Sequence, residues 1–221
     1  MFLKKILLYR QTFFKKINKN FYSQFGEDKI LDEIIPKDFS SGFYVDVGCF
    51  HPKKHSNTYM LYKKGWYGIN IDMEQDKIDT FNLARPKDFN FLGAISDKIE
   101  KTKIYRNQKF GVSSTINPDL LSTESIIDES FVQTTTLNNV LNISPFKNKR
   151  IDLLNIDTEG NDLKVLKSLD FNIYQPKIII IETHLKNIED IINSEIYKYL
   201  FLKDYKLKSW NIYSLIFVKW N

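Results

Sequence analysis

Acidic residues recur at the places where apolar segments of this 221-residue chain end. Asp46 lies in FYVDVG, Asp72 ends WYGINID, and Asp157 ends RIDLLNID. Apolar runs of this kind, alternating with helical patterns, indicate a parallel sheet that is covered on both faces. Because the carboxyl ends of parallel strands meet at one edge of the sheet, a single crevice is expected to collect the polar residues there. These residues are Asp46, Asp72, Ser96, Asp97, Asp157, Glu159, Glu182 and His184.

The first two of these acids have the spacing of an adenosine site. In Asp46-Val47-Gly48 the glycine allows a tight turn, and an acid such as Asp72, about 25 residues further on, can accept both ribose hydroxyls. A dinucleotide site needs G-x-G-x-x-G, and a triphosphate site needs G-x-x-x-x-G-K-[ST]; the sequence has neither motif. Adenosine without a phosphate cradle predicts S-adenosylmethionine. The residues expected to bind this cofactor are Asp46, Gly48, Asp72, Met73, Ser96 and Asp97.

The later acids have the spacing expected of an acceptor site for methyl transfer. The reaction is an in-line displacement, and a hydroxyl is a poor nucleophile until a base or a metal takes charge of its proton. Asp157 and Glu159 are two residues apart, as are Glu182 and His184, and alternation along a strand points such pairs to one side. We expect Asp157 to lie nearest the acceptor, Glu159 to orient a hydroxyl, and His184 to act as general base.

Other roles for the same residues stay open. Asp157 is also placed to cap the helix NDLKVLKSL, a role that Asp162 can fill as well. His184 can be a hydrogen-bonded structural histidine, and Glu182 an ion-pair partner. A Mg²⁺ or Mn²⁺ ion held by Asp157, Glu159 and His184 is chemically sensible, because carboxylates and imidazole suit these ions, but the sequence does not require it.

The pattern of the rest of the chain predicts the elements that position these residues. We predict one doubly wound α/β domain over residues 22–221, with a mostly parallel sheet of the Rossmann-like type. Residues 98–150 are rich in β-branched residues, which favours a hairpin-like excursion and a connecting loop outside the main sheet, and YKLKSW and YSLIFVKW form a C-terminal antiparallel hairpin. Strands are expected at 42–48, 66–72, 88–96, 150–157 and 177–184, and helices at 27–35, 56–65, 75–84 and 161–169.

Residues 1–21 form a separate basic arm. The formal net charge is +5, but residues 1–20 hold six basic residues and no acidic ones, which leaves 26 Lys+Arg against 27 Asp+Glu elsewhere. The body therefore lacks the excess of positive charge expected of a nucleic-acid-binding domain. The arm has apolar residues at near-helical spacing, and two interpretations stay open: packing on this domain or on a second copy, and peripheral contact with an anionic membrane.

Cysteine content and the absence of a leader pattern bear on the location of the protein. The single cysteine, Cys49, excludes an intramolecular disulfide and a multi-cysteine zinc site, which fits a reducing cytoplasm. The apolar stretch of the arm is too short and too charged for a transmembrane span, and no small-residue cleavage site follows it. We therefore expect a cytoplasmic protein, with membrane association only through the arm.

Several segments, between about Tyr22 and His184, resemble the FkbM family of S-adenosylmethionine-dependent methyltransferases. In order, they are YSQFGEDKIL, FYVDVGCFHPKKHSNTYMLYKKGWYGINIDM, the Arg85-Pro86 pair, LGAISD, TTTLNNVL and LLNIDTEGNDLKVLKSL. The resemblance implies a class I methyltransferase sheet with an antiparallel seventh strand, and O-methylation of sugars or polyketide-type hydroxyls. By position, Asp46 and Gly48 match the first cofactor motif, and Asp72 stands where many members have Glu. The loop that carries His51-Pro52 and Ser56-Asn57-Thr58 departs from the commoner small-residue pattern.

Three other function classes compete with O-methylation of a sugar or glycan. A glycosyltransferase is disfavoured because no D-x-D motif stands at a strand end. Enzymes that methylate exocyclic amines of RNA or DNA carry an N-P-P-[YF]-like turn after the fourth strand, where this chain has Asn155-Ile156-Asp157-Thr158. A non-catalytic scaffold is disfavoured because it has no need for acids at four strand ends. We therefore expect a methyltransferase with a saccharide acceptor, acting in surface polysaccharide biosynthesis, and no nucleic-acid partner.

Overall fold

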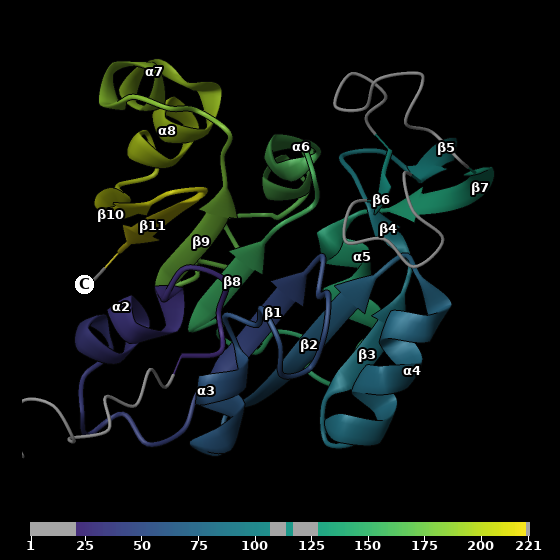
Figure 1. Cartoon of the computed structure of the whole chain (residues 1–221), viewed down its shortest axis with the longest axis horizontal. Helices are drawn as coiled ribbons and strands as arrows, with labels where there is room; N and C mark the ends of the chain where they lie inside the picture. The colour runs from purple at the N-terminus through teal and green to yellow at the C-terminus, as the bar shows by residue number, and fades with distance from the viewer. Residues whose placement is uncertain (1–20, 107–113, 117–127, 220–221) are drawn as a thin grey trace, which may run out of the picture.

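The computed structural model of the chain describes residues 21–106, 114–116 and 128–219 (Figure 1). The basic arm predicted over residues 1–21 therefore lies, apart from its last residue, outside the described part of the chain. Within the described ranges, no helix is both long enough and apolar enough to cross a membrane.

The main sheet has seven strands and confirms the predicted doubly wound architecture (Figure 1). Its order is β10-β11-β9-β8-β1-β2-β3, so the strand order reverses between β1 and β8, where ligands of such sheets bind. Six of the seven strands run in one direction, and only β11 is antiparallel to its neighbours β9 and β10, with which it completes the predicted C-terminal hairpin. The strands are β1 Phe43–Val47, β2 Tyr67–Asp72, β3 Phe89–Leu92, β8 Leu153–Ile156, β9 Ile178–Glu182, β10 Lys206–Asn211 and β11 Ser214–Val218.

Helices cover both faces of this sheet because its strands are apolar on both sides. Val45 and Val47 of β1 pack in one core with α5, α6, α7 and α8, whereas Tyr44 packs in another with α2 and α3. Helix α4 packs Ile78 and Phe81 against Cys49. The helices are α2 Glu27–Ile34, α3 Tyr59–Lys63, α4 Gln75–Ala84, α5 Leu137–Ile143, α6 Asp162–Lys167, α7 Ile188–Asn193 and α8 Glu195–Phe201.

The third predicted strand, residues 88–96, is wrong in its second half. Strand β3 ends at Leu92, the Gly93 N–H donates to the Asp72 carbonyl over 2.9 Å, and the chain then leaves the main sheet. Residues Ala94–Ile95 form β4 in a second sheet of order β4-β7-β5-β6. The other strands of that sheet are β5 Lys101–Arg106, β6 Ser114–Thr115 and β7 Asp128–Thr135.

The stretch 98–150 is hairpin-like, as expected, because β5 and β7 pair antiparallel outside the main sheet. Part of its connecting loop is instead helix α5, in which Leu137, Val140 and Leu141 are fully buried. Their spacing of three and four residues is helical, and the surrounding β-branched residues obscured it in the sequence.

Gly48 makes the turn at which β1 meets its neighbours. Its φ is +82°, and a Cβ at this position would lie 1.7 Å from the carbonyl oxygen of Asp157. The backbone N–H groups of Gly48 and Cys49 both donate to the Ile71 carbonyl, over 2.9 and 3.0 Å, and the Asp157 N–H donates to the Val47 carbonyl over 2.9 Å. The ends of β1, β2 and β8 are thus bonded to one another at a point with no room for a side chain.

Replacement of Gly48 by Ala should therefore destabilise the fold more than replacement of Gly65. Gly65 also has a positive φ, +92°, but nothing lies within 4 Å of a Cβ added there. Gly65→Ala should therefore lower the free energy of unfolding only by the strain of a left-handed backbone, about 1–2 kcal/mol. Gly48→Ala adds displacement of the neighbouring backbone and should cost about 3 kcal/mol or more. Urea unfolding of both variants measures the difference, and equal losses would contradict the close approach at Gly48.

Candidate functional site

A cleft of about 270 Å³ opens at the carboxyl ends of the parallel strands, where the sequence places the acidic residues. Its walls come from the ends of β1, β2, β8 and β9 and from the turn between β10 and β11. Apolar lining residues include Val47, Phe50, Ile71, Met73, Ala94, Ile95 and Ile116. Polar lining residues are Gln24, His55, Asp72, Lys77, Asp157, Thr158, Glu159, Asn161, Glu182, His184 and Tyr213.

Asp72 is the buried acid on the β2 side of the cleft, where it is the last residue of that strand. Its Oδ1 accepts a hydrogen bond from the Glu74 N–H over 2.9 Å, and its Oδ2 pairs with Lys77 Nζ over 3.1 Å. Burial raises the pKa of the Asp72 carboxyl, and the positive charge of Lys77 opposes that shift. Lys77 in turn lies over the Phe50 ring, 5.6 Å from its centroid. Because each carboxylate oxygen can accept more than one hydrogen bond, Asp72 keeps capacity for a ligand hydroxyl.

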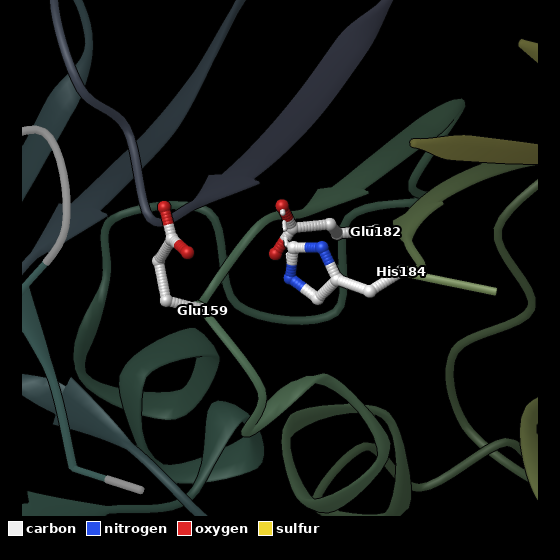
Figure 2. Close-up of side chains that lie close together, drawn as sticks. All are labelled: Glu159, Glu182 and His184. Atoms are coloured by element: carbon white, nitrogen blue, oxygen red, sulfur yellow. Dashed lines mark ion pairs between the residues drawn. The ribbon is translucent and has the colours of Figure 1, made fainter. Parts of the chain in front are cut away.

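Four titratable side chains gather on the β8–β9 side of the cleft. Asp157 and Glu159 lie in the loop after β8, Glu182 ends β9, and His184 follows two residues later. His184 Nε2 lies 3.7 Å from Glu182 Oε1, and Figure 2 shows the Glu159 carboxylate reaching toward this pair from its own loop. Alternation along a strand does not explain why these side chains converge. Asp157 and Glu159 both lie beyond the end of β8, and His184 lies beyond the end of β9. Glu159 also has a positive φ of +52°, which is not a strand conformation.

The carboxylates on this side perturb one another. Burial raises the pKa of both Asp157 and Glu182. The negative charges of Asp162 and Glu159 raise the pKa of Asp157 further, and the negative charge of Asp157 raises that of Glu182. Burial also raises the pKa of Glu159, against the opposing effect of His184.

Asp162, and not Asp157, holds the turn that leads into α6. Its Oδ1 accepts hydrogen bonds from the Thr158 N–H over 2.8 Å and the Thr158 hydroxyl over 3.0 Å, and its Oδ2 accepts from the Gly160 N–H over 3.0 Å. The N-cap of α6 is Asn161, without a side-chain capping hydrogen bond, so neither aspartate fills the capping role that the sequence left open. Asp157 instead faces the other acids of the cleft.

The structure brings six of the predicted site residues to the cleft lining, namely Gly48, Asp72, Met73, Asp157, Glu159 and His184. Asp46 lies inside β1 and points toward α3, where its Oδ2 accepts from the Thr58 hydroxyl over 2.7 Å and its Oδ1 from Asn155 Nδ2 over 2.8 Å. Burial raises the pKa of the Asp46 carboxyl, and the Thr58 hydrogen bond opposes that shift. Asp46 therefore stabilises the loop after β1 through Thr58 and is not among the described residues that line the cleft.

Ser96 and Asp97 also lie outside the described lining. The chain turns at Gly93 and pairs with β7, so Gly93, Ala94 and Ile95 occupy the place in the cleft that the sequence assigned to Ser96 and Asp97. Ser96 is buried instead, where its N–H donates to the Thr135 carbonyl over 2.9 Å.

Several residues that line the cleft come from distant segments and were not predicted from the sequence. Gln24 precedes α2, His55 lies in the loop after β1, and Tyr213 lies in the turn between β10 and β11, with its ring centroid 5.7 Å from that of His184. No local spacing could have marked them. Lys77 could have been found, because it lies five residues after Asp72, in the first turns of the predicted helix.

Arg85 fixes the loop after β1 from beneath. The guanidinium is fully buried and donates to the Pro52 carbonyl over 2.6 Å, to Ser56 Oγ over 3.0 Å and to Thr58 Oγ1 over 2.8 Å. A further hydrogen bond, over 3.2 Å, reaches the hydroxyl of Tyr44 in β1. The Arg85-Pro86 pair of the sequence resemblance therefore supports the loop that carries His55 into the cleft.

The strand order, the antiparallel last hairpin, and a cleft with an acid at the end of β2 together define a class I S-adenosylmethionine-dependent methyltransferase. The chain belongs to the FkbM methyltransferase family, since the model of the Methyltransferase FkbM domain matches residues 46–207. A TehB-like SAM-dependent methyltransferase from Corynebacterium glutamicum ATCC 13032 Kitasato aligns with a TM-score of 0.44 and 12% identity, over 99% of this chain and 96% of that one. No curated protein matches the sequence.

Loss of the Arg85 guanidinium should destabilise the domain strongly. Arg85→Lys keeps the charge but cannot reach all the acceptors at once, which leaves buried polar groups unpaired, at a cost of about 3–5 kcal/mol. Arg150→Lys is the matched control, because Arg150 is exposed, and it should change the free energy of unfolding by less than about 0.5 kcal/mol. Urea unfolding measures both, and a loss below about 1 kcal/mol for Arg85→Lys would refute its supporting role.

Proposed function

We propose that this methyltransferase acts on a hydroxyl of a saccharide, either a free sugar unit or a glycan. The observation that carries the proposal is the gathering of three carboxylates and an imidazole on the β8–β9 side of the cleft, opposite the Asp72 side. Carboxylates accept hydrogen bonds from hydroxyls, and a saccharide presents several neighbouring hydroxyls. Tyr213, 44% exposed, adds an aromatic face beside His184.

The β2 side suits the adenosine part of the cofactor. Asp72 is held by Lys77 and Glu74 with its carboxylate in the cleft wall, and no phosphate-binding glycine loop adjoins it in the sequence. Gly48 and Met73 line the same side, and we assign them to the cofactor together with Asp72. S-adenosylmethionine, when bound, supplies an electrophilic methyl group. The protein's part is to aim an acceptor oxygen at that group and to exclude water.

The β8–β9 side suits the acceptor. We assign Asp157 to the reacting hydroxyl and Glu159 to a hydroxyl beside it, as the sequence predicts. His184 has about half of its side chain exposed, so an acceptor can reach it, and its role as general base stays a prediction. The sites of the two reactants are thus separated only by the turn at Gly48.

A nucleic-acid acceptor fits this cleft poorly. Asp157, Glu159 and Glu182 place negative charge where a phosphate backbone would have to approach, and binding of nucleic acid depends on neutralising phosphates with cations. The loop after β8 reads Asp157-Thr158-Glu159-Gly160, without the proline and aromatic residues that grip an exocyclic amine. These features favour a saccharide acceptor over nucleic acid. A cytoplasmic step of surface polysaccharide biosynthesis stays a prediction from the sequence.

Asp72→Ala should weaken binding of S-adenosylhomocysteine, since it removes a charge-assisted hydrogen bond to ribose worth roughly 1.5–3 kcal/mol. That loss corresponds to a Kd raised about 10- to 150-fold, measured by calorimetry. Asp76→Ala is the control, because it removes an exposed carboxylate from the first turn of the nearby helix α4 and should leave the Kd unchanged. An unchanged Kd in a folded Asp72→Ala variant would show that Asp72 does not bind the ribose.

A screen with radiolabelled S-adenosylmethionine should show methyl transfer to sugar nucleotides, glycans or lipid-linked saccharides, and none to RNA, DNA or protein. Asp157→Asn should reduce that transfer at least about 100-fold, while melting temperature and S-adenosylhomocysteine affinity stay near wild type. Methylation of RNA would overturn the acceptor class. A large loss of stability in Asp157→Asn, with activity per folded molecule intact, would show that Asp157 serves the fold.

A further inference from the structure

Glu159, Glu182 and His184 place three metal-ligating groups around one point of the cleft. One carboxylate oxygen from each glutamate and one imidazole nitrogen all lie within 4.8 Å of one another. Two metal–oxygen bonds of about 2.0–2.6 Å span about 4–5 Å, so a single cation between these atoms can reach all three. Figure 2 shows the carboxylates of Glu159 and Glu182 facing each other, with the His184 ring beside the second.

The charge of this cluster is poorly compensated. Glu182 Oε2 is buried, and no group in the described part of the chain donates a hydrogen bond to it. Asp157, the carboxyl next to it, adds further negative charge. Among the described lining residues, the one ammonium group belongs to Lys77, and it is paired with Asp72 over 3.1 Å. A buried acceptor without a donor is costly, and a bound cation removes that cost.

We infer that Glu159, Glu182 and His184 bind one divalent cation of the Mg²⁺ or Mn²⁺ type. Two carboxylates and an imidazole suit these ions, with Mn²⁺ favoured by the nitrogen ligand. Three protein ligands leave coordination positions open toward the cleft. The ligand set differs from the one considered from the sequence, because Glu182 takes the place of Asp157; Glu182 is the acid whose Oε1 lies 3.7 Å from His184 Nε2.

The role of the ion rests on the proposed hydroxyl acceptor. Glu159, Glu182 and His184 would hold the ion so that an acceptor oxygen bound to it would lose its proton more readily, and Asp157, the cleft carboxylate outside the ligand set, would take that proton. The oxygen would then form the bond to the methyl carbon as the carbon–sulfur bond breaks, with its electron pair going to sulfur. His184, bound through its imidazole, serves in this arrangement as a ligand and not as the general base predicted from the sequence.

Titration of the full chain with MnCl₂, after treatment with EDTA and dialysis, tests the site without cofactor or acceptor. The electron paramagnetic resonance signal of free Mn²⁺ should show one ion bound per chain. Glu182→Gln and His184→Gln should each raise the Kd at least tenfold, whereas Glu33→Gln, at an exposed acid of α2, should leave it unchanged.

Absence of saturable binding by the wild type below about 1 mM, or equal affinity in all variants, would overturn the inference. If Glu182→Gln does not fold, as judged by its melting curve, His184→Gln decides, because the His184 side chain is 49% exposed and its loss spares the core. This result can be told apart from that of the acceptor screen. Mn²⁺ binding without methylation of any saccharide would support the metal site and contradict the proposed function. Saccharide methylation without Mn²⁺ binding would contradict the metal site alone.

Discussion

The contact between Gly48 and the Asp157 carbonyl is the constraint on which the cleft depends. A Cβ at position 48 would lie 1.7 Å from that oxygen, so the loop after β1 and the loop after β8 can close on each other only around a glycine. The first of these loops borders the Asp72 side, and the second carries Asp157 and Glu159. A methyl donor and its acceptor must come within bonding distance, and the two proposed reactant sites lie on either side of this contact.

The buried charged groups Arg85 and Glu182 have different surroundings on the two sides of that turn. Arg85 is buried with carbonyl and hydroxyl acceptors around it, and it holds the loop after β1 against the sheet. In the cleft, by contrast, Glu182 keeps a buried oxygen without a donor among the described residues. Arg85 Nε and Trp66 Nε1 are also buried without a partner among the described residues, so an unpaired buried atom alone does not mark a ligand site. What distinguishes Glu182 is that its carboxylate lines a cleft beside other metal-ligating groups.

Much of the architecture could be predicted from the sequence because its signals are local. Apolar strands that alternate with helical segments gave the parallel sheet, and an acid at a strand end identified Asp72. Asp46 lies inside β1, so alternation along the strand points its side chain at Thr58 and Asn155 and not at the residues that line the cleft, and its contact with the cofactor stays a prediction. Ser96 and Asp97 lie off the cleft because the turn at Gly93 transfers the chain to another sheet, which no spacing in the sequence announces.

The central claim is that the cleft holds an adenosine cofactor on the Asp72 side with its reactive end toward the carboxylates. A crystal structure of the full chain with bound S-adenosylhomocysteine tests it most directly. We expect ribose hydroxyls hydrogen-bonded to Asp72 and a sulfur atom directed past Gly48 toward Asp157. Ribose bound elsewhere, or a sulfur atom facing away from Asp157, would contradict it.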